Sequence, residues 1–234
     1  MRDEHGVDVP YSSLTRLIRQ QELREKKELI GRFVFEPGEE MQHDTSPHCF
    51  VLGEKRITAQ CASLVLAYSR RIFIQYFPVF TRFEAKVFLT NACRFMEGAS
   101  RRCVIDNSSV IVASGSGANA KIAPEMEAFG TTFGFSFIPH AVRRPQRKGQ
   151  VERQFHYAEN NFLVGRYFSD WEDLNAQALQ WCNTFANQKV KRSLGKTPEA
   201  AYLMERRHLT ALPAYIPPVF QIEHRVVDLE GYIN

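Results

Sequence analysis

The sequence predicts an α/β fold in which a mixed five-stranded sheet carries helices on both faces. Three β-rich segments follow one another with short turns between them, a pattern typical of an antiparallel meander. Two further apolar strands then alternate with helical segments, and helical crossovers of this kind join parallel strands of one sheet. The chain has 234 residues, 44% of them hydrophobic and 24% charged, so it can bury a sizeable core.

The three strands of the meander are rich in β-branched and aromatic residues, and short turns separate them. They are predicted at residues 41–51, 56–66 and 72–77. A helix follows at residues 83–96, where apolar side chains recur at helical spacing, and Gly98 closes it.

The second half of the sheet begins with a short apolar strand at residues 102–106, which ends in Asp106. A strand this apolar is typical of the buried centre of a sheet, and its acid then lies at the carboxyl tip. If it runs beside the first strand, Asp44 and Asp106 become neighbours. The next predicted elements are a flexible Ser/Gly-rich loop at 114–119, a helix at 124–133, a strand at 135–139 and a helix that carries Glu152. A long helix is then predicted at 170–186, with Leu174, Ala178, Trp181 and Phe185 on one face. A short helix follows, which starts at Pro198 with Thr197 as its cap.

The two ends of the chain differ from this alternating pattern. Residues 10–30 predict a helix, which is either the last helix of a helix-turn-helix or a plain amphipathic helix. Beyond Pro213 the chain is rich in proline, and residues 226–232 resemble a strand cut short. The expected organisation is a helical N-terminal segment at 1–36, a core at 37–168, C-terminal helices at 169–208, and a tail at 209–234 that leads into a truncated β domain.

Positive charge is concentrated in two parts of the chain. Residues 143–166 and 189–207 each contain six Lys or Arg against two Glu, a local net charge of +4 in both cases. The whole chain also has a formal net charge of +4, so the remainder is near neutral or acidic. A nucleic acid is therefore a better candidate partner than an acidic protein or a membrane.

The sequence also bears on the compartment. It has no run of about 18 apolar residues and no apolar N-terminal segment like that of a signal peptide, which favours a cytoplasmic protein. The five cysteines are odd in number and form no C-x-x-C pair, which predicts reduced, mostly buried thiols and disfavours a structural zinc site.

One acid stands out within the first basic region. Val151, Phe155, Ala158 and Phe162 recur at helical spacing, and Glu152 lies at the edge of that apolar stripe. A single carboxylate among basic residues suggests chemistry on a polyanion, with a metal ion between the acid and the phosphates. The alternative is a surface Glu on an amphipathic helix. Two further acids, Asp44 and Asp106, favour the chemical interpretation.

Three segments together resemble the signatures of the DDE transposase and retroviral integrase catalytic core. They are residues 38–44, which end in His43-Asp44, residues 103–107, which contain Ile105-Asp106, and residues 148–153, which contain Val151-Glu152. The later residues 161–168, 173–177 and Trp181-Cys182 are similar to one branch, the IstA-type transposases of two-gene bacterial insertion sequences. The resemblance covers roughly residues 10–234, and it rests on the ordered set of motifs.

This resemblance implies a ribonuclease-H-like fold and a polynucleotidyl transferase that processes 3′ ends and transfers strands of insertion-sequence DNA. It implies that Asp44, Asp106 and Glu152 hold two Mg²⁺ or Mn²⁺ ions, which also relieve the mutual repulsion of three carboxylates. Its implied partners are terminal-repeat DNA, a target duplex, further copies of the chain on DNA and an ATP-using helper protein. The basic residues expected to contact DNA phosphates are Arg143, Arg144, Arg147, Lys148 and Arg153.

The chain departs from the family pattern at two places. The branch often has an aromatic residue or Gly directly after its first Asp, whereas Thr45-Ser46-Pro47 follows Asp44 here. A family member would also have a fuller helix-turn-helix before residue 10 and a small β domain after Asn234.

Some single motifs also fit other kinds of site. Residues 115–120 fit the pattern G-x-G-x-x-A, but a dinucleotide site would place it in a first βαβ unit with an acid about 20 residues later, and both are missing. Four of the seven histidines were candidate metal ligands, but no pair of them has H-x-x-x-H spacing; they are His43, His48, His140 and His156. At the level of the whole chain, the alternatives are a non-catalytic DNA-binding remnant and a nuclease of the same fold that cuts without joining.

Overall fold

The computed structural model describes Ser13, Arg16 and residues 35–106, 108–139 and 155–220. The chain divides into two compact units, Met1–Val34 and Phe35–Asn234. The helix predicted at residues 10–30 lies almost wholly outside the described residues. The second unit contains all of the elements discussed below.

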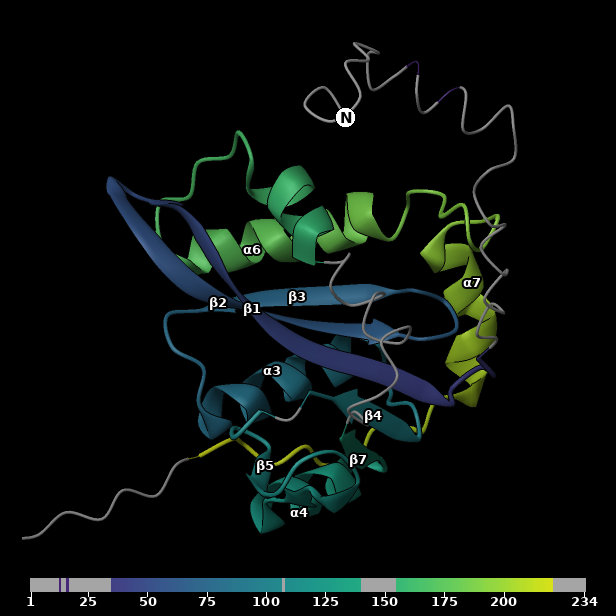
Figure 1. The fold of residues 1–234 in the computed structure, drawn as a ribbon. Coiled ribbons are helices and arrows are strands. Elements are labelled where there is room, and N and C mark those ends of the chain that lie inside the picture. The colour runs from purple at the N-terminus through teal and green to yellow at the C-terminus, as the bar shows by residue number, and fades with distance from the viewer. Residues whose placement is uncertain (1–12, 14–15, 17–34, 107, 140–154, 221–234) are drawn as a thin grey trace, which may run out of the picture. The chain divides into compact units, whose positions relative to one another are not determined.

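A five-stranded mixed sheet forms the centre of the second unit, with the order β3-β2-β1-β4-β7 (Figure 1). β1 pairs antiparallel with β2, and β2 with β3, while β1 and β4, and β4 and β7, pair in parallel. The predicted meander is confirmed, and the strand predicted at 102–106 lies in the interior of the sheet beside the first strand. The strands are β1 (Glu40–Leu52), β2 (Lys55–Leu66), β3 (Ile72–Phe77), β4 (Arg102–Ile105) and β7 (Ser136–Pro139).

Helices cover both faces of this sheet, as predicted (Figure 1). One face packs on α3 (Arg82–Phe95) and α4 (Pro124–Phe133). The other packs on helical residues 155–163, of which Glu159–Leu163 are π-helical, on α6 (Trp171–Trp181), and on a π-helical turn, η3, at Cys182–Ala186. After these come α7 (Pro198–Glu205), which begins with Pro198 after the predicted cap Thr197, and the 3-10 turn η4 (Arg206–His208).

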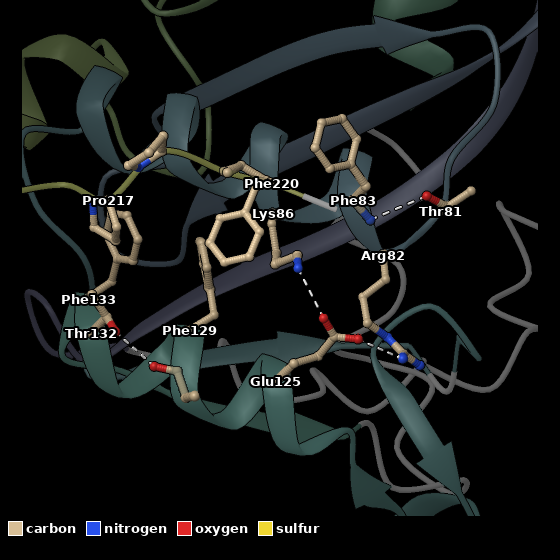
Figure 2. A pocket seen from close by; sticks show the side chains of 13 residues that line it. Thr81, Arg82, Phe83, Lys86, Glu125, Phe129, Thr132, Phe133, Pro217 and Phe220 are labelled. Atoms are coloured by element: carbon tan, nitrogen blue, oxygen red, sulfur yellow. Dashed lines mark hydrogen bonds and ion pairs between the residues drawn. The ribbon is translucent and has the colours of Figure 1, made fainter. Parts of the chain in front are cut away.

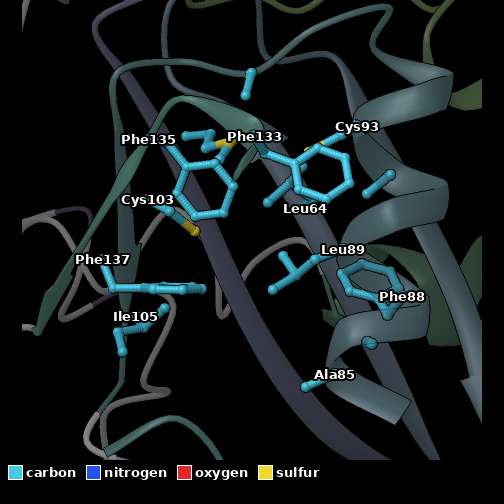
Figure 3. Packing of buried hydrophobic residues seen from close by; sticks show 14 of the residues in the cluster. Leu64, Ala85, Phe88, Leu89, Cys93, Cys103, Ile105, Phe133, Phe135 and Phe137 are labelled. Carbon is cyan, nitrogen blue, oxygen red and sulfur yellow. The ribbon is translucent and has the colours of Figure 1, made fainter. Parts of the chain in front are cut away.

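The spacing of apolar residues in α3 decides which of its faces meets the sheet. Its buried side chains recur three or four residues apart and pack against strand residues such as Leu64 and Phe137 (Figure 3). They include Ala85, Phe88, Leu89, Ala92 and Cys93. The helix begins with a capping box, in which the Thr81 side chain accepts a hydrogen bond from the backbone and the Glu84 carboxylate accepts one from the Thr81 N–H.

The face of the sheet that packs on α6 is rich in aromatic side chains. Leu174, Ala178 and Trp181 are buried there, as the predicted long helix required. The prediction for Phe185 was wrong, because this side chain is 41% exposed. The chain changes to π-helical geometry at Cys182, which shifts the phase of the helix so that Cys182 and Ala186 turn inward instead.

The predicted flexible loop at residues 114–119 is also corrected. A small antiparallel pair of strands, β5 (Val112–Ser114) and β6 (Lys121–Ile122), brackets a 3-10 turn at Gly117–Asn119. Gly115 has φ +78°, and a Cβ there would lie 2.2 Å from the carbonyl oxygen of Asn119. The glycines therefore build a tight reversal between two short strands.

Two asparagine side chains satisfy the outer edge of β3. Asn175 of α6 accepts from the Tyr76 N–H at 2.8 Å and donates to the Tyr76 carbonyl at 3.0 Å. Asn187 pairs in the same way with Ile72, at 2.9 Å for both bonds. An exposed strand edge offers unpaired backbone N–H and C=O groups to other chains. Here the side-chain amides of the two asparagines form hydrogen bonds with these groups at Tyr76 and Ile72.

The cysteines are free, and four of them are buried, as predicted. Burial raises the pKa of these four thiols, which are Cys61, Cys93, Cys103 and Cys182. In the described part of the chain, no helix combines the length and apolar character that crossing a membrane requires.

Candidate active site

Asp44 and Asp106 lie beside each other where β1 and β4 run in parallel. The paired register ends with His43 opposite Ile105, so the next residue on each strand is one of the two acids. Both acids line one small cavity of about 20 Å³, together with Phe80, Ser108 and Ile111 among others. Side chains at matching positions of parallel neighbours point to the same face, so the two carboxylates share one side of the sheet.

Local structure explains the position of each acid. Asp44 is half-buried within β1, and its Oδ1 accepts a hydrogen bond from the Thr45 N–H at 2.8 Å. Asp106 follows the last residue of β4 and is exposed. Its backbone carbonyl accepts from the Ser108 N–H at 2.7 Å, which turns the chain away from the sheet directly after the acid.

His43 separates the acids from the core on the α3 side. Its Nδ1 lies 3.0 Å from the Ser63 carbonyl oxygen, and its ring stacks on Phe88 with 5.1 Å between ring centroids. Burial lowers the pKa of His43 to about 4, against the smaller opposing effect of the bond to Ser63. The imidazole is therefore neutral at neutral pH, and it adds no positive charge behind Asp44.

His48 lies on the face of β1 opposite to His43. It follows Asp44 by four residues. Its Nδ1 lies 3.2 Å from the Tyr76 hydroxyl, and its ring meets Phe155 edge-on at 5.8 Å. Its Nε2 lies 3.8 Å from a carboxylate oxygen of Glu159. Helical residues 155–163 thus pack against the face of β1 on which Asp44 also lies, because residues four apart in a strand share a face.

Two of the three predicted acids are brought together, and the third lies outside the described residues. That third acid is Glu152. The five basic residues predicted to contact DNA also lie outside the described residues: Arg143, Arg144, Arg147, Lys148 and Arg153. His140 and the first residue of the apolar stripe, Val151, are also outside. Within the described ranges, no three His, Cys, Asp or Glu side chains are gathered so as to hold a metal ion.

The donors that are present suit a hard divalent cation. Two carboxylates on neighbouring strands, one within β1 and one directly after β4 and exposed to solvent, offer the oxygen ligands that Mg²⁺ and Mn²⁺ prefer. The nearest imidazole is held by Ser63 and buried among aromatic rings, so it competes poorly as a ligand.

A larger cavity lies away from the acids and shows different chemistry. It measures about 660 Å³ and lies between α3, α4 and the segment Pro217–Phe220 (Figure 2). Phe129 and Phe133 line it, and Glu125 at its rim is held by Arg82 and Lys86 at 2.9 Å each. Its only described carboxylate is neutralised by two cations, so this cavity is a poorer candidate for metal chemistry.

The polar cluster of His48, Tyr76 and Glu159 was not predicted from the sequence. The sequence contains one indication of this cluster. His48 follows Asp44 by four residues, and alternation along a strand places both side chains on one face. Its partners come from β3 and from the helical residues 155–163, which no local pattern could associate with it.

Similarity to known proteins agrees with this geometry. The chain is 27% identical over 220 residues to the transposase for insertion sequence element IS21 of Pseudomonas aeruginosa, an alignment that covers 92% of this chain and 55% of that protein. It is 27% identical over 183 residues to the transposase for insertion sequence element IS640 of Shigella sonnei, covering 77% of this chain and 57% of that protein. The chain thus spans about half the length of these relatives. No protein-family model matches it.

Among solved structures, the catalytic core domain of BIV integrase superposes with a TM-score of 0.52 at 17% identity, covering 73% of this chain and 97% of that domain. This likeness establishes the fold, which is the ribonuclease-H-like fold of integrase catalytic cores. Together with the transposase relatives, it confirms the predicted resemblance to a transposase or integrase core.

Proposed function

We propose that this chain, with the fold of a transposase or integrase core, is the catalytic region of a metal-dependent DNA transposase. In this proposal it processes 3′ ends of insertion-sequence DNA and joins them to a target duplex. The observation that carries it is the adjacency of Asp44, within β1, and Asp106, directly after β4, on one face of the sheet. The names of the sequence relatives point in the same direction.

Asp44 and Asp106, with Glu152 as the third carboxylate, would hold two Mg²⁺ or Mn²⁺ ions. When bound, such ions supply electrophilic stabilisation for an in-line displacement at phosphorus. The N–H of Thr45 fixes the orientation of the Asp44 carboxylate. The neutral His43 behind it leaves the negative charge of the acids available to cations.

The position of Phe155 supports Glu152 as the third acid. Phe155 contacts His48, which follows Asp44 by four residues on β1, a strand rise of about 13 Å. Glu152 precedes Phe155 by three residues, and three residues of chain reach up to about 10 Å. A glutamate side chain can close the difference, so the chain length permits all three carboxylates to meet.

DNA is the proposed substrate, both as terminal repeats and as target. The proposal includes phosphate contacts by Arg143, Arg144, Arg147, Lys148 and Arg153, since cations of this kind neutralise the backbone without reading bases. It also includes assembly of several copies on DNA and an ATP-using helper protein encoded by the same element.

The test is a strand-transfer assay on the protein that contains this chain. The substrates are duplexes that end in the terminal repeats flanking its gene, together with a supercoiled plasmid and Mg²⁺. We expect Asp44→Asn, Asp106→Asn and Glu152→Gln each to lower the joining rate by roughly a thousandfold or more, because each loses a charge that holds metal. Glu54→Gln, in the exposed turn between β1 and β2, is the matched control and should join at the wild-type rate.

Binding gels on the same preparations separate chemistry from affinity. The acid variants should bind DNA about as well as the wild type, since the Lys and Arg surface is unchanged. Near-normal joining by Asp44→Asn or Asp106→Asn would refute the proposed site. Cleavage without joining by the wild type would instead indicate a nuclease of the same fold, and binding with neither step a non-catalytic remnant.

A further inference from the structure

Residues 189–196 form a compact basic turn between η3 and α7. Backbone bonds close it: the Lys191 N–H donates to the Lys196 carbonyl at 3.1 Å, and two N–H groups donate to the Lys191 carbonyl at 2.9 Å. Gly195 has φ +67°, the conformation that lets the chain reverse here. The turn therefore presents its cations from a defined backbone; they are Lys189, Lys191, Arg192 and Lys196.

The cations of this basic turn have no acidic partner among the residues that the structure describes. No Asp or Glu occurs in the sequence between Asp173 and Glu199. Among the residues that the structure describes, none of the four cations forms an ion pair, and all but Lys191 are exposed. Other cations among the described residues do pair with glutamates, namely Arg71, Arg82, Lys86, Arg102 and Arg206.

Aromatic rings hold two of these lysines in place. The Nζ of Lys191 lies 4.2 Å from the centroid of the Tyr157 ring, and that of Lys189 lies 5.5 Å from the Phe185 ring. Burial, and then the charge of Lys189, lower the pKa of Lys191. Like charges are thus kept together at a partly buried position, and a bound polyanion would relieve their repulsion.

Tyr157 connects the basic turn to the candidate active site. It belongs to helical residues 155–163, whose Phe155 and Glu159 contact His48 on the Asp44 face of β1. The basic turn thus adjoins the helical residues that pack on the Asp44 face of β1.

We propose that the basic turn is a second binding surface for DNA phosphates, distinct from the basic residues of 143–153. This inference rests on the proposed function, because it takes DNA as the substrate. These cations project from a short turn closed by its own backbone, not from a helix or strand of the kind that enters a groove. Its contacts are therefore to the DNA backbone and independent of base sequence. It would hold DNA that flanks the reacting phosphate.

The experiment compares two triple variants with equal loss of charge. The turn variant carries Lys189→Gln, Arg192→Gln and Lys196→Gln. The control variant carries Arg94→Gln, Arg101→Gln and Lys121→Gln, three exposed cations on other elements. The full chain is titrated with a fluorescent 30-base-pair duplex between 50 and 200 mM salt, in EDTA so that no cleavage or joining contributes.

Each phosphate contact adds about 0.9 to the slope of log affinity against log salt. The turn variant should therefore lose about two to three units of slope, equally for duplexes of different sequence, and the control variant less than one. Circular dichroism establishes that both are folded. If the triple substitution impairs folding, the single exposed change Lys196→Gln should still reduce the slope by about one unit.

Three outcomes would overturn the proposal. One is a turn variant that binds DNA with the wild-type slope. Another is an equal loss of slope in both variants, which would show that net charge alone matters. The third is an unchanged slope with altered self-association in sedimentation, which would assign the turn to contacts between copies. Failure of the proposed function is seen separately, as normal joining by Asp44→Asn, and leaves the slopes unaffected.

Discussion

β1 carries one buried histidine toward each face of the sheet, and the two have different surroundings. His43 faces α3, where its ring stacks on Phe88 and its Nδ1 bonds the Ser63 carbonyl. His48 faces helical residues 155–163, where it meets the Tyr76 hydroxyl and approaches Glu159, while its Nε2 has no hydrogen-bond partner among the described residues.

The two histidines show that the two faces of the sheet differ in their chemistry. The α3 face is an apolar core in which the Nδ1 of His43 is paired with the Ser63 carbonyl of the neighbouring strand β2. The opposite face mixes aromatic rings with polar groups that link β1 to the helical residues after Glu152. We infer that the first face supplies stability and the second adjusts the candidate active site.

The largest expected effect comes from the α3 face. Phe88 is fully buried and contacts His43, Phe73 and Phe77. Phe88→Ala should lower the free energy of unfolding by about 3–5 kcal/mol, through lost burial and the cavity left behind. Urea unfolding measures it. Phe83→Ala, at a partly exposed position of the same helix, should cost clearly less, and equal losses would contradict a tightly packed α3 face.

A smaller effect should appear as a pH dependence of stability. The pKa of His43 is about 4 in the folded chain and 6.5 in its ordinary state, so the unfolded chain binds the proton first as pH falls. The stability contributed by this neutral, buried histidine is complete above pH 6.5 and is lost as pH falls toward 4. His43→Gln keeps a donor for Ser63 but does not titrate.

Relative to this variant, the wild type should therefore lose about 2 kcal/mol of unfolding free energy between pH 7 and pH 5. Urea unfolding of both proteins at pH 7, 6 and 5 gives the difference. Parallel curves for the two proteins would show that His43 is not buried in the neutral form.

The smallest expected effect concerns the other histidine. Burial lowers the pKa of His48, and the nearby charge of Glu159 opposes that shift. Glu159→Gln removes the opposing charge, so the pKa of His48 should fall further. An NMR titration of the His48 ring follows it, with Glu172→Gln on α6 as the control. A pKa that rises or stays unchanged would show that Glu159 does not act on His48, and that the two faces differ less than proposed.

Much of the fold followed from the sequence because local periodicity reports burial. The strands predicted at 56–66 and 72–77 agree with β2 and β3 within one residue at each end, and the helix predicted at 124–133 agrees with α4. The capping pattern of Thr197 and Pro198 located the start of α7. Phe185 was misplaced because the sequence pattern assumes one continuous α-helix, and the π-helical turn at Cys182 breaks that assumption.

The candidate site was predictable only in part. An acid directly after an apolar strand signals the end of a buried strand, so Asp106 could be found from its neighbours alone. Asp44 has no such local signal, since it lies in the middle of β1 and is followed by Thr45-Ser46-Pro47; only the resemblance to known transposases singled it out. The roles of Asp44, Asp106 and Glu152 remain proposals.

By itself the sequence determined the elements, the face of each that is buried, and the acids to be considered. Tertiary structure alone decided that β1 pairs with β4, that His48 meets Tyr76 and Glu159, and that Asn187 completes the β3 edge 115 residues away in the chain. The physical reason is that burial has a local period, set by the helix and the strand. Pairing between distant segments depends on which packed arrangement has the lowest free energy for the whole chain, and no single segment encodes it.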